Sequence, residues 1–339
     1  MEFGLLAHSA ALHLPLAALA AVLLDRLLGE PRRLHPLCGF GRLAEGLECL
    51  LNRPGRVAGR PLPPWRLRLA GVCAWCLAVL PPVALAFWWQ AQPGWAWIVD
   101  VFLCYFALGA RSLFLHGEAV CRPLAANNLP EARRRVGALV SRDTSRLCAT
   151  GIARAGVESV LENGNDAIFA ALFWFALLGG PGALAFRLAN TLDAMWGYRT
   201  HRFLHFGWAA ARADDLLNWI PARLTAATYA LLGSPGRALS CWRRQASAWE
   251  SPNAGPVMAA GAGSLGVLLG GSAHYPHEDG IREELRPPLG EGPPPDHRHL
   301  HAAMRLVARG LILWLALFLI LGILRTILQN APAYPIAIG

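Results

Sequence analysis

Long apolar runs, separated by segments rich in arginine, dominate the pattern of this chain. Four of the runs approach the roughly 20 residues that an α-helix needs to cross the hydrocarbon core of a bilayer. These predicted spanning helices are residues 11–28, 69–89, 95–115 and 306–328. The pattern therefore predicts an all-α fold, a polytopic integral membrane helix bundle that forms one domain over residues 1–339.

Three further apolar stretches are short or interrupted. They are residues 167–189, which contain Gly179-Gly180-Pro181-Gly182, residues 216–233, which contain Pro221 and Arg223, and residues 256–271, which contain five glycines. Irregular backbone at membrane depth is tolerated only where it is buried in protein or lines a cavity. We therefore expect broken or re-entrant helices in these stretches, which leaves the number of crossings between about five and eight.

The distribution of arginine predicts the orientation. Residues 29–68 carry eight arginines and residues 116–165 carry seven, whereas the tail after Arg325 carries none. By the positive-inside rule the basic segments face the cytoplasm and both termini face outward, as in a multi-pass protein of the cell (inner) membrane. Residues 37–51 have apolar side chains at helical spacing and predict a cytoplasmic amphipathic helix, and residues 272–305 predict a cytoplasmic loop.

Composition narrows the chemistry. All 31 basic residues are arginine, so a P-loop lysine and a Schiff-base lysine are both excluded. Phosphate or carboxylate groups would have to be bound by arginine forks, backbone N–H groups or a metal ion. The net charge of +9 does not indicate nucleic-acid binding, because the arginines lie between apolar segments in a pattern that sets membrane topology.

Residues 141–253 contain more polar groups than a membrane scaffold requires. Glu158, Glu162 and Asp166 recur every four residues, so they share one face of a helix predicted over residues 152–166. A solvated helix face would show the same spacing. However, Asp166 runs directly into an apolar segment, where a carboxylate usually has a specific partner or ligand. The active-site loops are therefore expected in this region, on the cytoplasmic side.

The acidic, amide and arginine groups of this region suit Mg²⁺ together with a polyphosphate. Hard cations prefer oxygen ligands, and the arginine fork matches phosphate oxygens. Proton-coupled transport would also use carboxylates inside the membrane. The inventory by itself therefore leaves both a ligase and a transporter open.

Several segments match one known family in order along nearly the whole chain. They are Asp25 with Gly29-Glu30-Pro31 and His35-Pro36, Ser141-Arg142-Asp143-Thr144, Ala155 to Asp166, Asn190-Thr191-Leu192-Asp193 with Gly197-Tyr198-Arg199, Phe206 to Arg212, Asp214-Asp215, Asn218 to Thr225, and Ser251 to Gly255. In these segments the sequence resembles the adenosylcobinamide-phosphate synthase family, the CobD/CbiB type of cobalamin biosynthesis. It departs from the family pattern at Ala171, where that pattern tends to have proline.

The resemblance implies an ATP-dependent carbon–nitrogen ligase. The reaction would join (R)-1-amino-2-propanol or its O-phosphate to a side-chain carboxylate of adenosylcobyric acid, with Mg²⁺ and ATP. As hypotheses we assign catalytic roles to Glu158, Glu162, Asp166 and Asp193, metal binding to Asp193, Asp214 and Asp215, and substrate binding to Arg142, Asn163, Asn190, Tyr198, Arg202, Asn218, Arg223, Ser251 and Asn253.

Two other functions remain open at this point. The same carboxylates could serve a transporter for a corrinoid or another anionic solute, or the chain could be a non-catalytic membrane anchor for other cobalamin-assembly enzymes. Besides the corrinoid, the amine, ATP and membrane lipid, the partners could include a second copy of the chain or those other enzymes. The sequence does not decide between free and phosphorylated aminopropanol.

Overall fold

The structure is a computed structural model that describes residues 2–30, 36–52, 56–57, 60–61, 63–277 and 280–330. Its helices are α1 (Glu2–Leu28), α2 (Pro36–Leu51), α3 (Pro64–Gln90), α4 (Ala96–Ala107), α5 (Ala110–Ala125), α6 (Leu129–Gly137), α7 (Ala149–Gly164), α8 (Ala170–Trp196), α9 (Trp208–Leu232), α10 (Pro235–Gln245), α11 (Ala254–Leu265) and α12 (His297–Asn330), with a π-helical turn η1 (Asn165–Phe169) and a 3-10 turn η2 (Ala246–Ala248). The strands form two antiparallel hairpins, β1 (Arg56–Val57) with β2 (Arg60–Pro61), and β3 (Leu269–His277) with β4 (Gly280–Leu289).

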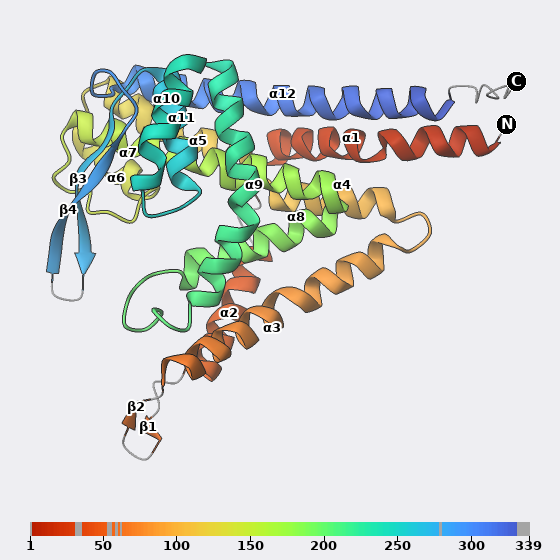
Figure 1. The fold of residues 1–339 in the computed structure, drawn as a ribbon, viewed down its shortest axis with the longest axis horizontal. Coiled ribbons are helices and arrows are strands. Elements are labelled where there is room, and N and C mark those ends of the chain that lie inside the picture. Colours follow the sequence, from red (N-terminus) through yellow and green to blue (C-terminus); the bar gives the residue numbers. More distant parts are fainter. Residues whose placement is uncertain are drawn as a thin grey trace, which may run out of the picture.

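Five helical segments of the described residues are long and apolar enough to cross a membrane. They are Ala11–Leu28, Pro64–Gln90, Ala96–Ala125, Ala149–Trp196 and His297–Asn330. This confirms a polytopic all-α membrane protein. In Figure 1, α1 and α12 run side by side, and their outer ends lie at the same end of the bundle. The β3–β4 hairpin and α6, α7 and α10 gather at the opposite end, which we call the polar end.

The predicted span 95–115 is not one continuous helix. The chain leaves helical geometry at Leu108, whose ψ is 149°, so α4 ends before it and α5 begins at Ala110. The amide of Gly109 lacks its helical acceptor and donates instead to the carbonyl of Ala167, at 3.0 Å. The break therefore ties α4 and α5 to the π-helical turn that carries Asp166. Hydropathy alone gave no sign of it, because Leu108 and Gly109 continue the apolar run.

The interrupted stretch 167–189 reverses direction, as a re-entrant segment does. Gly179 adopts φ 67° and ψ −158°, a conformation that is essentially restricted to glycine. A Cβ on Gly182 would lie 2.5 Å from the carbonyl oxygen of Trp174, although residues eight apart on a straight helix are about 12 Å apart. The two arms of α8 are thus antiparallel, as Figure 1 shows. The carboxylate of Asp100 accepts the Gly180 amide at 2.6 Å and stabilises the tip.

The reversal matters for the site because it returns the chain to the polar end. The incoming arm begins just after Asp166, and the outgoing arm ends just after Asn190 and Asp193. Side chains that lie 27 residues apart in the sequence therefore come to line the same cavity. The π-helical turn at Asn165–Phe169 is a distortion of a kind often found at functional sites.

Two other stretches differ from the prediction in secondary structure. Residues 272–305, predicted as a loop, contain most of the β3–β4 hairpin and the first turns of α12. The register pairs Leu269 with Leu289 and Gly271 with Arg286, so the base of the hairpin is a regular antiparallel ladder with one bulge. Pro221, expected to interrupt a helix, lies inside the continuous α9. The amphipathic helix predicted over 37–51 is present as α2.

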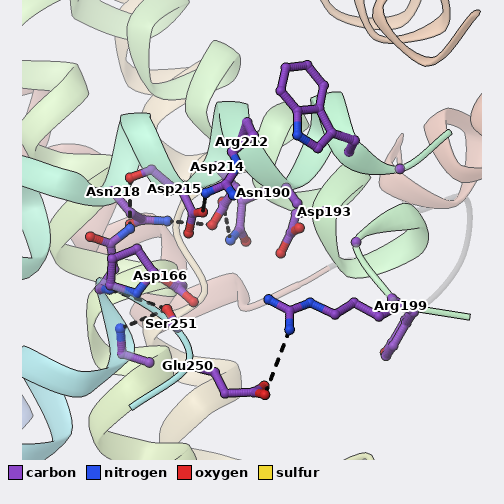
Figure 2. A pocket seen from close by; sticks show the side chains of 18 of the residues that line it. Asp166, Asn190, Asp193, Arg199, Arg212, Asp214, Asp215, Asn218, Glu250 and Ser251 are labelled. Carbon is purple, nitrogen blue, oxygen red and sulfur yellow. Dashed lines mark hydrogen bonds and ion pairs between the residues drawn. The ribbon is translucent and has the colours of Figure 1, made fainter. Parts of the chain in front are cut away.

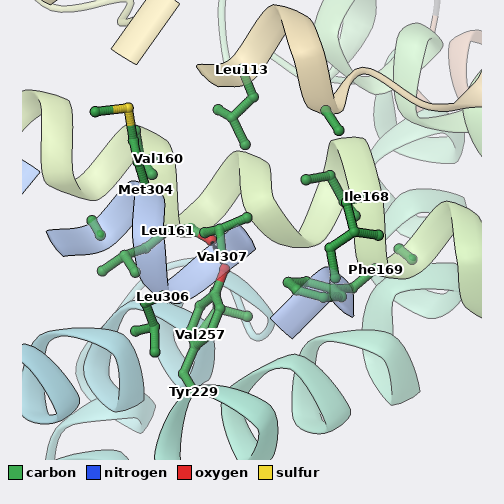
Figure 3. Packing of buried hydrophobic residues seen from close by; sticks show 14 of the residues in the cluster. Leu113, Val160, Leu161, Ile168, Phe169, Tyr229, Val257, Met304, Leu306 and Val307 are labelled. Atoms are coloured by element: carbon green, nitrogen blue, oxygen red, sulfur yellow. Dashed lines mark hydrogen bonds between the residues drawn. The ribbon is translucent and has the colours of Figure 1, made fainter. Parts of the chain in front are cut away.

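A core of aromatic and aliphatic side chains holds α7, α9 and α12 together at the polar end. Phe169 packs edge-to-face against Tyr229 and at a tilt against Trp314, and all three side chains are buried. The Tyr229 hydroxyl donates to the carbonyl of Leu161 at 3.0 Å, which satisfies both groups in the apolar interior. Figure 3 shows this packing, with Leu161, Phe169 and Tyr229 among the labelled residues. The core therefore fixes the helix face from which Glu162 and Asp166 reach the cavity.

Candidate functional site

The polar end of the bundle contains a cavity of about 810 Å³. It lies where η1, the end of α8, the start of α9 and the turn before α11 meet. We call it the acidic cavity because six carboxylates line it: Glu162, Asp166, Asp193, Asp214, Asp215 and Glu250. Its amides are Asn165, Asn190, Asn218 and Asn253. Figure 2 shows Asp193 on one side of this space and Asp214, Asp215 and Asn218 on another.

A chain of amide side chains orients Asp214. Asn190 donates to one of its carboxylate oxygens at 3.0 Å, and Asn218 donates to the other at 3.1 Å. The oxygen of Asn218 accepts from Asn165 at 2.8 Å, and Asn165 in turn accepts from Thr225 at 2.9 Å. Since α8, α9 and η1 each contribute to it, this network fixes one acidic group at the junction of three elements. Asp214 and Asn218 lie four residues apart on α9 and so share a helix face.

Glu162 and Asp193 are the carboxylates most available to a ligand. Within the described part of the chain, no hydrogen bond or ion pair is made by either side chain, although both line the acidic cavity. Asp166 accepts one hydrogen bond, from Asn165 at 2.9 Å. Acceptors left without donors in a partly buried cavity are unfavourable unless a cation, a donor or water reaches them.

The charge balance of the acidic cavity favours cationic ligands. Burial raises the pKa of Asp214 and of Asp215 above their ordinary value, and the nearby Arg212 and Arg199 partly offset this at Asp215. Arg212 lies 3.3 Å from Asp215, and Arg199 lies 3.8 Å from Glu250 at the cavity mouth. Arg68 also lines the cavity. Anionic groups could reach these arginines while a cation neutralises the carboxylates.

The donor set fits Mg²⁺ that arrives with a phosphate ligand. Among the described residues, no three His, Cys, Asp or Glu side chains come close enough to form a ready-made metal site. Mg²⁺ is usually bound by one or two carboxylates plus substrate phosphates and water, and does not need a complete protein cage. Asp193, Asp214 and Asp215, predicted as metal ligands, all line the acidic cavity and could supply those one or two carboxylates.

A second cavity of about 910 Å³ adjoins the first. We call it the hairpin cavity because β4 forms part of its wall through Glu284, Leu285, Arg286 and Pro287. The residues that line both cavities are Glu162, Gly197, Tyr198, Arg199, Trp249 and Glu250. The two spaces are therefore neighbours with a common wall, and Glu162 is the carboxylate of that wall that has no hydrogen bond or ion pair among the described residues.

Glu158, predicted to be catalytic, is instead saturated by partners. Its side chain is 3% exposed and forms ion pairs with Arg142 and with Arg286, the latter at 2.8 Å. Its other oxygen accepts from the amide of Gly270 at 2.9 Å and from Arg286 at 3.1 Å. Arg142, predicted to bind substrate, is 7% exposed and is committed to the same carboxylate. This arrangement attaches the β3–β4 hairpin to α7, which is a positioning role.

The remaining predicted residues divide into two groups. Those that line a cavity are Asn163, Asn190, Tyr198, Asn218, Ser251 and Asn253. Arg202 and Arg223 line neither of the two cavities. Arg202 pairs with Glu48 of α2 and holds the pKa of that carboxyl below its usual value. Arg223 donates to the side chain of Asn253 at 2.8 Å and so positions the turn before α11.

Sequence reasoning missed the cavity arginines Arg68, Arg199, Arg212 and Arg286 as ligand-facing or anchoring groups. Arg199 directly follows Tyr198 in a segment that was singled out, so its position was an available signal. Arg286 carried no signal, because it lies in a segment whose strands were not predicted. His35, also singled out, lies outside the described residues.

The fold and the site together define a polytopic helical membrane protein with a carboxylate- and amide-lined cavity at one end of the bundle. Comparison with known proteins assigns the chain to a family. The model of the family described as CobD/Cbib protein matches residues 18–307, so the chain belongs to the CobD/CbiB family. The family acts in cobalamin biosynthesis, which gives the chain its pathway.

Curated relatives agree over most of both chains. A cobalamin biosynthesis protein CobD of Stutzerimonas stutzeri is 57% identical over 307 residues, which is 91% of this chain and 97% of the relative. That of Chromobacterium violaceum is 57% identical over 317 residues, 93% and 98% of the two chains. That of Mycobacterium tuberculosis is 41% identical over 297 residues, 85% and 89%. No solved structure matches the chain.

Proposed function

We propose that this protein is an ATP-dependent acid–amine ligase, which joins (R)-1-amino-2-propanol or its O-phosphate to a carboxylate of adenosylcobyric acid. The observation that carries the proposal is the acidic cavity, with its six carboxylates and its neighbouring arginines, in a chain of the CobD/CbiB family. A scaffold or an anchor would have no need for two carboxylates, Glu162 and Asp193, that have no partner among the described residues at the end of a membrane bundle.

The reaction requires an activated carboxylate. A carboxylate oxygen of the corrinoid attacks the γ-phosphorus of ATP, so an O–P bond forms and ADP leaves, giving an acyl phosphate. The amine nitrogen then attacks the acyl carbon, and inorganic phosphate leaves with the electron pair of the broken C–O bond. The nitrogen must lose a proton, which a carboxylate base accepts. Glu162 suits this step, because it lines both cavities and has no partner among the described residues.

The other groups of the cavity have separable tasks. One or two of the carboxylates Asp193, Asp214 and Asp215 would hold Mg²⁺, which would neutralise charge on the phosphates. Arg199 and Arg212 lie beside these carboxylates and would meet phosphate oxygens that face away from the metal. Asn190 and Asn218 keep Asp214 in one orientation, so the donor set is preorganised.

The proposal includes an orientation. The arginine-rich segments and both cavities lie toward the polar end, so this end would face the cytoplasm of a cell whose inner membrane holds the protein. ATP is a cytoplasmic metabolite, and a site for it has to open on that side. A cysteine introduced at Leu204, which is 49% exposed beside the acidic cavity, would then be labelled by a membrane-impermeant thiol reagent only from inside. Labelling from outside would show that the polar end faces away from the cytoplasm and would contradict the proposed orientation.

The test is a mass-spectrometric assay of the purified chain in detergent with adenosylcobyric acid, Mg-ATP and each form of the amine. We expect a product heavier than the corrinoid by the amine minus water, together with one ADP and one phosphate per product. Asp193→Asn should lower turnover roughly 100-fold or more. Asp296→Asn is the matched control, since Asp296 caps α12 away from both cavities and asparagine caps a helix about equally well.

Three outcomes would contradict the proposal. Corrinoid uptake into vesicles without any covalent product would indicate a transporter. Normal turnover by Asp193→Asn would remove that carboxylate from the site. A fully active pathway in cells that carry both Glu162→Gln and Asp193→Asn would indicate an anchor without catalytic function.

A further inference from the structure

The β3–β4 hairpin places an apolar side chain at the mouth of the hairpin cavity. Leu285 lines that cavity although its side chain is 86% exposed. An isolated exposed leucine on a soluble surface is unremarkable. This one lies on a cavity wall, beside Pro287 and facing a space that is also lined by Met258 and Trp249.

The hairpin is attached firmly at its base. Glu158 accepts hydrogen bonds from the amide of Gly270 on β3 and from the guanidinium of Arg286 on β4, so one buried carboxylate holds both strands. The guanidinium carbon of Arg286 also lies 5.5 Å from the ring centroid of Trp249. Leu285 is adjacent to Arg286 in β4, and its place at the mouth is therefore set by a preorganised anchor.

The two cavities differ in chemistry. The acidic cavity has six carboxylates and suits a cation with its phosphates. The hairpin cavity has aromatic and aliphatic side chains with hydroxyl and amide groups: Tyr198, Trp249, Met258, Leu139, Val140, Leu285, Ser141, Thr200, Ser159 and Asn163. Its charged lining residues are Glu158, Glu162, Glu250, Glu284, Arg142, Arg199 and Arg286. Of these, Glu158 is paired with Arg142 and Arg286, so the arginines largely balance the carboxylates. A corrinoid is a broad, largely apolar macrocycle that carries neutral amide arms. Such a surface matches apolar walls with a few amide and hydroxyl partners.

We infer that the hairpin cavity binds the corrinoid and the acidic cavity binds the Mg-nucleotide, so that the two substrates enter from separate sides and meet at their common wall. This inference rests on the proposed function and adds which substrate occupies which cavity. A whole corrinoid exceeds a space of about 910 Å³. Its reacting arm would enter toward Glu162, while the macrocycle would cover Leu285 at the mouth.

The experiment compares one leucine from each wall in the full-length protein in detergent. Leu285 lines only the hairpin cavity and Leu204, 49% exposed, lines only the acidic cavity. Equilibrium dialysis of adenosylcobyric acid, followed by its visible absorbance, gives the corrinoid Kd, and calorimetry gives the Kd of Mg-ADP. Leu285→Ala should weaken the corrinoid roughly 5- to 20-fold, Leu285→Asp more strongly, and neither should change the Mg-ADP Kd beyond about twofold. Leu204→Ala should leave the corrinoid Kd unchanged.

The inference is overturned if both Leu285 variants bind the corrinoid as the wild type does, or if Leu204→Ala weakens the corrinoid as much as Leu285→Ala. A loss of Mg-ADP affinity in the Leu285 variants equal to the loss for the corrinoid would also overturn it. The proposed function fails separately, when the wild-type protein yields no covalent product in the mass-spectrometric assay. A wild type that forms product, with Leu285 variants that bind normally, refutes the assignment of cavities alone.

Discussion

Two glutamates one helical turn apart, Glu158 and Glu162, should respond in opposite ways to the same substitution. Both lie on α7, and both line the hairpin cavity. Glu158 is paired with two arginines and a backbone amide, whereas Glu162 has no partner among the described residues. We expect Glu158→Gln to lower the stability of the protein and Glu162→Gln to lower its turnover.

The size of the stability loss follows from the contacts. Removing one charge of a buried ion pair costs about 3–5 kcal/mol, because the partner charge stays buried without compensation. Here Arg142 is 7% exposed and Arg286 is 11% exposed, so water screens them little. Glutamine keeps one acceptor oxygen and can retain one or two of the hydrogen bonds. We therefore expect Glu158→Gln to lower the free energy of unfolding by about 3 kcal/mol.

Glu162→Gln removes a charge that faces other carboxylates and forms no ion pair among the described residues. Its free energy of unfolding should equal or exceed that of the wild type, while turnover falls roughly 100-fold as the proton acceptor is lost. Unfolding in mixed micelles and the mass-spectrometric assay measure the two quantities on the same preparations. Wild-type stability in Glu158→Gln, with turnover lost and corrinoid affinity kept, would refute the reasoning and make Glu158 catalytic.

Two further predictions concern the hairpin of α8 and the acidic cavity. Gly179→Ala should destabilise the protein by about 2–3 kcal/mol, because φ is 67° and the new Cβ would lie 2.7 Å from Asp100. The control is Gly46→Ala in α2, which has open space around it and should leave the stability unchanged. Equal unfolding midpoints for the two variants would contradict the prediction. The pKa of Asp214 and of Asp215 is raised, so both carboxylates should become protonated at a pH at which an ordinary aspartate is still ionised. We therefore expect the affinity for Mn²⁺-ADP, measured by paramagnetic resonance, to fall on acidification in that range. An affinity that stays unchanged down to about pH 4 would refute this prediction.

Local pattern predicted much of the fold. The predicted spans 11–28, 69–89 and 306–328 lie inside α1, α3 and α12, and the helix predicted over 152–166 is α7 with the start of η1. These predictions succeed because a bilayer demands long apolar helices whatever their neighbours are. The re-entrant stretch was also foreseen in kind, since the run Gly179-Gly180-Pro181-Gly182 cannot continue a regular helix.

The features that the sequence did not predict have a common cause. The break at Leu108 is stabilised by the hydrogen bond from the Gly109 amide to the carbonyl of Ala167, which lies 58 residues beyond Gly109. The β3–β4 hairpin is attached through Glu158, whose contact with Gly270 joins residues 112 positions apart. Such partners are set by packing, and nothing in the local sequence specifies them. An arginine that binds a protein carboxylate and one that faces a ligand also look the same in a sequence.

The sequence by itself determined that this is a membrane protein, because burial in lipid depends on residue type. Its acidic and amide residues also marked residues 141–253 as the region of the candidate site, because the chemistry of oxygen ligands depends on residue type as well. Only the tertiary structure decided which of those groups face the acidic cavity. The reversal at Gly179 brings Asp193 to the cavity that Asp166 lines. Long-range contacts pair Glu158 with the β3–β4 hairpin, whereas Glu162 has no partner among the residues that the structure describes. Whether a charged side chain pairs with another protein group or faces a ligand depends on its neighbours in three dimensions. The spacing of residues along one helix does not specify those neighbours.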